Sequence, residues 1–283
     1  MEYSFFDNIN GGILHLLTDD SLKGRNYFME KNKGSFYTIV FNTGIDTFIE
    51  IDGVNHAFPA FSIIPIMFNQ SYIFRNTEDI VMWQFNREFY CIVNHDKEVG
   101  CAGFLFYGSW GQLVLETKEE VRRKLLLLLG VFREEFQDKD DIQGNMLRML
   151  LVRLIITITR MAREKYLPDR EKTDSRFDLL RQFNLLVERH FRAEHEVQFY
   201  AAALFKSPKT LANTFARFHS GSPLQIIHQR LILEAKRLLY YTDKSIKEIS
   251  ADLGFDDAAH FTKFFKNHLE MSPSDFKKSA VAV

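Results

Sequence analysis

The chain has 283 residues, of which 46% are hydrophobic and 26% are charged. This length suits two domains, and this composition excludes an intrinsically disordered chain. A net charge of −1 excludes a strongly basic protein that binds nucleic acid by its overall charge alone.

Short apolar runs fill the first ~115 residues, and such runs separated by turn residues predict an all-β barrel or sandwich. Pro59 and Pro65 argue against long central strands in this region, because proline lacks a backbone N–H. The predicted strands are Phe36–Phe41, Thr47–Ile51, Phe61–Ile66, Tyr72–Arg75, Ile80–Phe85, Gly103–Tyr107 and Leu113–Leu115.

Two helices are predicted next, over Thr117–Gln137 and Ile142–Lys165. The second is apolar around most of its circumference between Leu147 and Ile158, which indicates packing on two sides. We expect one side to pack within the domain and the other against a second copy of the chain; packing within the chain alone is the alternative. Arginines interrupt the apolar stretch Met146–Met161, which is also shorter than the roughly 20 residues of a membrane span, so no membrane association is expected.

A charged segment that contains Pro168, Leu167–Thr173, predicts a solvated linker. We therefore expect one domain over residues 1–167, with helices over about 117–165, and another over 175–283. Asp174–Val283 carries 16 basic and 13 acidic residues, a net charge of +3, and the remainder carries −4. This asymmetry fits a DNA-binding module that is fused to another domain.

The C-terminal part repeats itself at an offset of 50 residues. A fixed offset indicates that one supersecondary unit occurs twice. The matched pairs are Leu211 with Phe261, Phe215 with Phe265, Ser207 with Asp257, and Ser222-Pro223 with Ser272-Pro273.

The second copy carries the local signals of a helix-turn-helix. Ser245 and Glu248 form a predicted capping box, Gly254 stands where the first helix must end, and Asp257 is placed to cap the next helix. Phe261 and Phe265 are its expected inward face.

In the first copy a helix over Val197–Leu204 is followed by a turn at Phe205-Lys206 and by Ser207-Pro208, which begins the next helix. A helix from Ser222-Pro223 to about Tyr241 joins the copies. At ~1.5 Å per residue it spans about 28 Å, near the ~34 Å between successive major grooves.

Four segments of this region, Arg230–Leu239, Ser245–Phe255, His260–Lys266 and Met271-Ser272-Pro273, resemble the AraC/XylS family of transcription regulators. The resemblance covers about Ser175 to Lys278. It implies an α+β multidomain protein: an N-terminal cupin-like β-barrel plus helices, and a C-terminal all-α domain with two helix-turn-helix units. The family often has glycine at the position of Glu270, so the turn there is an open question.

The exposed positions of each second helix are the expected contacts with double-stranded promoter DNA. Asn pairs well with adenine, and Lys reaches the guanine O6 and N7 atoms. By resemblance, base-reading positions are Lys209, Asn213, His260, Thr262 and Lys263; Thr210 is a further candidate, and Arg217 and Lys266 are expected on phosphates.

Enzyme signatures are not evident in the sequence. A cupin metal site needs His-x-His with further ligands, and the N-terminal part offers only His15, His56 and His95, so we expect no metal, no cofactor and no catalysis. Cys91 and Cys101 are expected to be reduced thiols in a cytoplasmic protein, in keeping with the lack of a signal-peptide pattern at the N-terminus.

Three hypotheses follow. The first is a homodimeric regulator that responds to a small-molecule effector and has RNA polymerase as a possible further partner. Its effector would lie inside the barrel against Tyr37, Trp83 and Phe85, if alternation along the strands turns these side chains inward. The second is a cupin-like enzyme fused to a DNA-binding module. The third is a ligand-independent regulator whose β domain only assembles the dimer.

Overall fold

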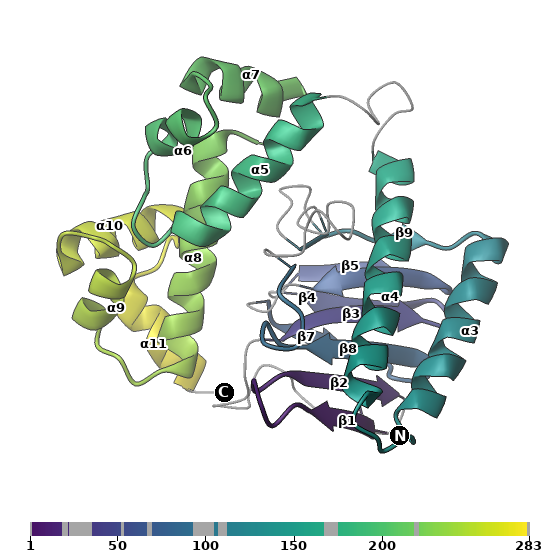
Figure 1. Ribbon diagram of the computed structural model, residues 1–283. Coiled ribbons are helices and arrows are strands. Elements are labelled where there is room, and N and C mark those ends of the chain that lie inside the picture. The colour runs from purple at the N-terminus through teal and green to yellow at the C-terminus, as the bar shows by residue number, and fades with distance from the viewer. Residues whose placement is uncertain are drawn as a thin grey trace. The chain divides into compact units, whose positions relative to one another are not determined.

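The computed structural model describes residues 2–18, 22, 36–51, 54–66, 70–92, 105–106, 112–166, 175–217 and 221–281. The chain divides into two compact units, Met1–Asp174 and Ser175–Val283 (Figure 1). The predicted linker Leu167–Thr173 lies outside the described residues.

The strands of the first unit form two antiparallel sheets. Their bounds are β1 Glu2–Phe6, β2 Ile13–Thr18, β3 Tyr37–Asn42, β4 Thr47–Ile51, β5 Val54–Phe58, β6 Ser62–Ile66, β7 Tyr72–Phe74, β8 Ile80–Phe85 and β9 Leu115–Glu116. The larger sheet has the order β1-β2-β8-β3-β6-β9, and the smaller has the order β5-β4-β7. The predicted α+β organisation, with a β-rich N-terminal part and a helical C-terminal part, is confirmed.

Most of the predicted strands are present, with small shifts at their ends. Sequence patterns missed β1, β2 and β5, although these strands pair with their neighbours over at least five residues each. The predicted strand Gly103–Tyr107 is contradicted where it is described, because Leu105 and Phe106 are helical.

The two sheets face each other across an apolar core. Leu17, Val40 and Met82 of the larger sheet pack with Ile49 and Phe58 of the smaller sheet, and all five are buried. Burial of aliphatic side chains from both sheets is the main force that holds such a sandwich closed.

The predicted orientation of Tyr37, Trp83 and Phe85 is wrong. Met82, which alternates with them along β8, lies in the core between the sheets, so these aromatic side chains occupy the opposite face of the larger sheet. There the Trp83 ring lies 5.8 Å from the ring of Phe132, and Tyr37 stacks on Phe85 at 5.5 Å. All three side chains are buried, but not inside the barrel.

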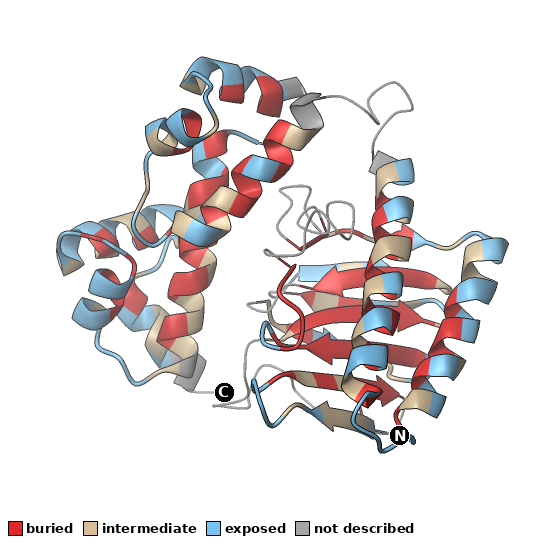
Figure 2. Cartoon of the chain, in the orientation of Figure 1, coloured by how far each residue is buried: buried red, intermediate tan, exposed pale blue. Residues whose placement is uncertain are grey.

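The aromatic face is covered by two helices, α3 (Glu119–Glu135) and α4 (Gln143–Tyr166), which lie over the larger sheet in Figure 1. Figure 2 shows buried and exposed residues alternating around both helices, as expected of helices that cover a sheet with one side. Among the described residues, no helix is long and apolar enough to cross a membrane.

The apolar stretch of α4 packs within the chain, which corrects the reason for expecting a dimer there. Leu147, Leu151, Ile155 and Ile158 are fully buried in this single chain. The apolar side chains left exposed on the helical layer are Leu126, Leu127 and Val131 of α3, Ile142, and Met146 and Met149 of α4.

Among the described residues of the second unit, all regular secondary structure is helical. Its helices are α5 Ser175–His190, α6 Val197–Ala203, α7 Pro208–Arg217, α8 Pro223–Tyr241, α9 Ile246–Asp252, α10 Ala258–Leu269 and α11 Pro273–Val281. In Figure 1, α8 runs through this unit, with α6 and α7 near one end and α9 to α11 near the other. The predicted joining helix is confirmed over its whole length, because α8 begins at Pro223 and ends at Tyr241.

Candidate DNA-binding surface

The second helix-turn-helix is formed by α9 and α10. The predicted capping box is present: the Ser245 hydroxyl accepts from the Glu248 backbone N–H, and the Glu248 carboxylate accepts from the Ser245 N–H at 2.7 Å. These hydrogen bonds lower the pKa of Glu248. Asp257 caps α10 by accepting from the His260 N–H at 2.7 Å, so both helices begin where the sequence predicts.

The turn between α9 and α10 requires glycine. Gly254 has φ +74°, and a Cβ there would collide with the carbonyl oxygen of Arg192. At the far end of α10, Glu270 takes the left-handed conformation with φ +58°. Glu270 therefore ends the helix in a conformation that glycine adopts more readily.

The first helix-turn-helix is formed by α6 and α7. Ser207 caps α7 by accepting from the Thr210 N–H at 3.1 Å. Leu211 and Phe215 are fully buried, as predicted, and the Phe215 ring lies 4.9 Å from the ring of Phe183 in α5. The inward face of α7 thus holds this helix against α5, and its other face is left to solvent.

A family model described as a helix-turn-helix domain matches residues 200–279, a range that spans both copies of the motif. The C-terminal unit therefore carries a helix-turn-helix domain, as the sequence predicts.

Two relatives of this chain are named for the same motif. The HTH-type transcriptional activator RhaS of Salmonella schwarzengrund is 22% identical over 245 residues, which are 85% of this chain and 84% of RhaS. The HTH-type transcriptional regulator YdiP of Escherichia coli K12 is 27% identical over 100 residues, which are 35% of this chain and 33% of YdiP.

Solved structures of the family resemble this chain at low identity. ToxT from Vibrio cholerae with a bound unsaturated fatty acid has a TM-score of 0.45 and 15% identity, over 98% of this chain and 90% of ToxT. The DNA-binding domain of AdpA in complex with a target DNA has a TM-score of 0.34 and 24% identity, over 39% of this chain and 96% of that domain.

In the first helix-turn-helix, α7 presents Lys209, Thr210 and Asn213 to solvent. The Thr210 hydroxyl lies 2.9 Å from that of Ser207 and is therefore partly engaged in the cap. Lys209 makes no ion pair within the described part of the chain, so its ammonium is available to a ligand. Arg217 belongs to α7, but its side chain lies outside the described residues.

In the second copy, α10 presents His260, Lys263 and Lys266 to solvent. Thr262 is half-buried, and its hydroxyl donates to the Ala258 carbonyl at 2.7 Å, which leaves it only acceptor capacity. The structure thus brings the predicted residues onto the second helix of each motif, on the side opposite the buried phenylalanines.

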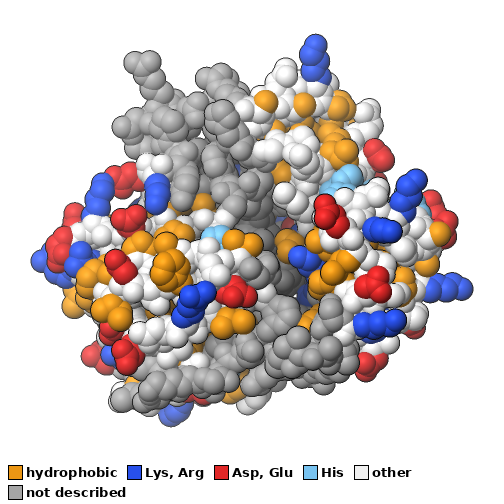
Figure 3. All heavy atoms as spheres, turned by 180° about the vertical axis from the view of Figure 1, so that it is seen from behind, with side chains coloured by type: hydrophobic (Ala, Val, Ile, Leu, Met, Phe, Trp, Pro, Cys, Tyr) orange, Lys and Arg blue, Asp and Glu red, His pale blue; other side chains and the backbone are white. Residues whose placement is uncertain are grey.

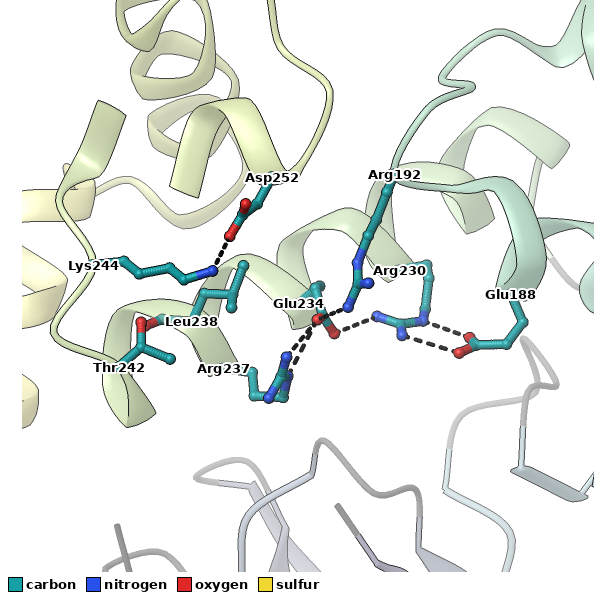
Figure 4. Close-up of polar contacts among 9 residues, drawn as sticks. All are labelled: Glu188, Arg192, Arg230, Glu234, Arg237, Leu238, Thr242, Lys244 and Asp252. Atoms are coloured by element: carbon teal, nitrogen blue, oxygen red, sulfur yellow. Dashed lines mark hydrogen bonds and ion pairs between the residues drawn. The ribbon is translucent and has the colours of Figure 1, made fainter. Parts of the chain in front are cut away.

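A buried ion cluster attaches the spacer helix α8 to α5, and sequence patterns gave no sign of it. In Figure 4 the carboxylate of Glu234 faces three guanidinium groups. It is 2.6 Å from Arg192, 3.2 Å from Arg230 and 2.8 Å from Arg237, and it is only 1% exposed. Arg230 in turn binds Glu188 of α5 at 2.6 Å, which joins the two helices.

The charges in this cluster stabilise one another against burial. Burial alone would raise the pKa of Glu234, but Arg230, Arg237 and Arg192 outweigh it and lower the pKa to about 2. Burial would lower the pKa of Arg230, but Glu188 and Glu234 together raise it. The cost of burying each charge is therefore offset only while its partners are present.

The loop between α5 and α6 also contacts the turn of the second motif. The His195 Nε2 lies 2.8 Å from the Leu253 carbonyl oxygen, and the His195 and Phe255 rings are 4.8 Å apart. Because a carbonyl only accepts, His195 donates this bond. Together with the close approach of Arg192 to Gly254, these contacts connect the turn of the second motif to the loop that leads into the first.

We predict that Glu234→Gln destabilises the C-terminal unit by about 3 kcal/mol at pH 7, because it removes the carboxylate that buried Arg230 shares with half-buried Arg237. The control Asp252→Asn removes the partner of Lys244 in a half-exposed pair and should cost at most about 1 kcal/mol. Chemical denaturation followed by circular dichroism measures both.

The pH dependence has a defined sign. The pKa of Glu234 in the fold, about 2, is below its ordinary value of 4.5, so its contribution is complete above pH 4.5 and is lost as the pH falls toward 2. The difference in the free energy of unfolding between the wild type and Glu234→Gln should therefore decrease as the pH falls from 4.5 toward 2. Equal destabilisation by the two substitutions at pH 7 would contradict this account.

Proposed function

We propose that this AraC/XylS protein binds promoter DNA sequence-specifically and places α7 and α10 in successive major grooves. The observation that carries the proposal is the pair of capped helix-turn-helix units on one 19-residue helix, α8. At ~1.5 Å per residue α8 spans about 28 Å, and the contacts described above connect the second motif to the loop that leads into the first.

The exposed side chains of α7 and α10 are proposed to make two kinds of contact with DNA. Lys209, Asn213, His260 and Lys263 are proposed to read base edges, and Lys266 and Arg217 to bind phosphates. Thr262, whose hydroxyl donates to the Ala258 carbonyl, is proposed to add acceptor contacts only, and Thr210 is proposed to contact DNA while its hydroxyl bonds that of Ser207. On the face drawn in Figure 3, Lys and Arg side chains lie among Asp and Glu side chains. Affinity for DNA must therefore come from individual cations at particular positions rather than from net charge.

We predict different effects for two lysines of α10. Lys263→Ala should reduce discrimination between operator and mismatched DNA by about 1–3 kcal/mol, since a base contact is lost. Lys266→Ala should weaken all sequences alike and reduce the slope of log affinity against log salt by about one. Fluorescence anisotropy with a selected operator and a scrambled duplex measures both, and a Lys263→Ala variant that weakens both duplexes equally would refute its role.

We propose a homodimer through the exposed apolar side chains of α3 and α4. Leu127 is 66% exposed and Met149 is 68% exposed. Met149→Asp should give a folded monomer, because a charge there repels a partner without entering the core. Leu151→Asp, the control, should unfold the unit, since Leu151 is fully buried. A Met149→Asp variant that stays dimeric in light scattering would refute this surface.

A small effector is proposed to bind between the two sheets, where a polar trio interrupts the apolar core. The Gln84 amide donates to the Tyr72 hydroxyl at 2.8 Å and lies 3.4 Å from the Thr38 hydroxyl. The Tyr72 hydroxyl also lies 3.3 Å from the sulfur of Met82. A few convergent polar groups in an apolar surrounding are typical of small-molecule sites.

A thermal-shift screen of metabolites tests this site. A ligand at 100 times its Kd should stabilise the protein by about 2.7 kcal/mol. Gln84→Leu should lose the shift, and Trp83→Phe, on the opposite face of the sheet, should keep it. A shift that survives Gln84→Leu but not Trp83→Phe would place the ligand elsewhere.

The other two hypotheses have less support. Filling of the barrel by phenylalanine would favour a ligand-independent protein, but Phe58 is the single fully buried phenylalanine of the described core between the sheets. For the enzyme, no group of three or more potential metal ligands occurs among the described residues. His15 instead bonds Ser4 at 2.8 Å, and His95 lies outside the described part.

A further inference from the structure

One aromatic side chain in the DNA-binding unit has no part in its packing. Phe205, in the turn between α6 and α7, is 93% exposed. An exposed phenylalanine gains nothing from the hydrophobic effect, so the stability of this chain does not explain it.

The backbone at Phe205 is also strained. Phe205 has φ +55°, a left-handed conformation that bulky residues rarely adopt. The turn is a Schellman motif, in which the Phe205 N–H donates to Ala202 and the Lys206 N–H to Ala201. Glycine is the usual residue at the position of Phe205.

The second helix-turn-helix shows what packing alone requires of this turn. Its α9 ends in the same motif, with C-cap dihedrals at Leu253 that agree with those at Leu204 within a few degrees. There the left-handed position is Gly254, and the aromatic residue follows it as Phe255, which is buried. In the first copy the order is reversed: the aromatic residue takes the exposed, strained position, and Lys206 follows it.

The position and the charges near Phe205 point to DNA as the occupant. Phe205 stands two residues before Ser207, the N-cap of α7, and in this motif the start of the second helix meets the base edges. Lys206 and Lys209 beside it are exposed. No acidic residue occurs between Glu196 and Glu234, so this copy presents only basic charges to a partner.

We infer that Phe205 contacts DNA and packs on a thymine methyl group beside the N-terminus of α7. Apolar contact with this methyl group is the one base contact that a phenyl ring makes well in the major groove. The inference rests on the proposed DNA-binding function and adds a specificity residue that the motif itself does not require.

The test is Phe205→Gly in the full chain. Glycine relieves the left-handed strain, so the melting temperature of the variant should rise by a few degrees while operator affinity falls about tenfold. Glu270→Gly relieves the same kind of strain at the end of α10 without removing a ring, so it should raise the melting temperature and leave affinity no weaker. Loss of affinity in a more stable protein cannot come from misfolding.

The DNA supplies the second arm of the test. Replacing operator thymines one at a time by uracil removes single methyl groups, and at one position this should weaken the wild type about fourfold and leave Phe205→Gly unaffected. Full operator affinity of Phe205→Gly, or uracil effects that are equal for both proteins at every position, would overturn the inference. Failure of the wild type to bind any duplex would instead refute the proposed function.

Discussion

The buried carboxylate of Glu234 is the interaction on which the geometry of the DNA-binding unit depends. It lies on α8 and joins three arginines, one of which connects to Glu188 of α5. Desolvation of a lone carboxylate is costly, so this arrangement exists only when α5, α8 and the loop that carries Arg192 are packed together. The spacer helix is therefore part of a single charged core and not a separate rod.

The same loop holds the turn of the second motif, through the contacts of Arg192 with Gly254 and of His195 with Leu253. A second link joins α8 to α10, where the ring nitrogens of His228 and His268 lie 3.2 Å apart. Burial and the neighbouring His268 lower the pKa of His228, so this link is kept with His228 neutral. These contacts hold α10 and the turn before it against α8 and the loop that leads into α6, and we therefore expect α7 and α10 to keep one relative position on DNA.

Sequence patterns predicted well those features that depend on residues close together in the chain. The capping box at Ser245, the cap at Asp257 and the start of α8 at Pro223 each depend on residues a few positions apart. Because the unit occurs twice, the sequence contains these local signals in two copies. Which of the exposed residues of α7 and α10 contact bases remains a prediction.

Sequence patterns failed to predict the features that depend on tertiary packing. Both β3 and β8 are buried on both faces. Alternation of side chains along these strands therefore shows which residues share a face, but not which face lines the core between the sheets. For this reason the predicted position of Trp83 is wrong. The broad apolar surface of α4 is buried within this chain. Its exposed apolar side chains, such as Met149, lie at other positions of the helix. The ion cluster of Glu188, Arg230 and Glu234 was not predicted, because sequence does not show which charges face one another.

The central claim is that one rigid unit reads two successive major grooves, and half-site spacing tests it most directly. A selected operator is lengthened by 5 base pairs between the two contacted segments, which turns them to opposite sides of the duplex, or by 10, which restores the side but not the distance. We predict that both insertions lower affinity to that of a single half-site. Equal affinity for the original and the lengthened operators would contradict the claim.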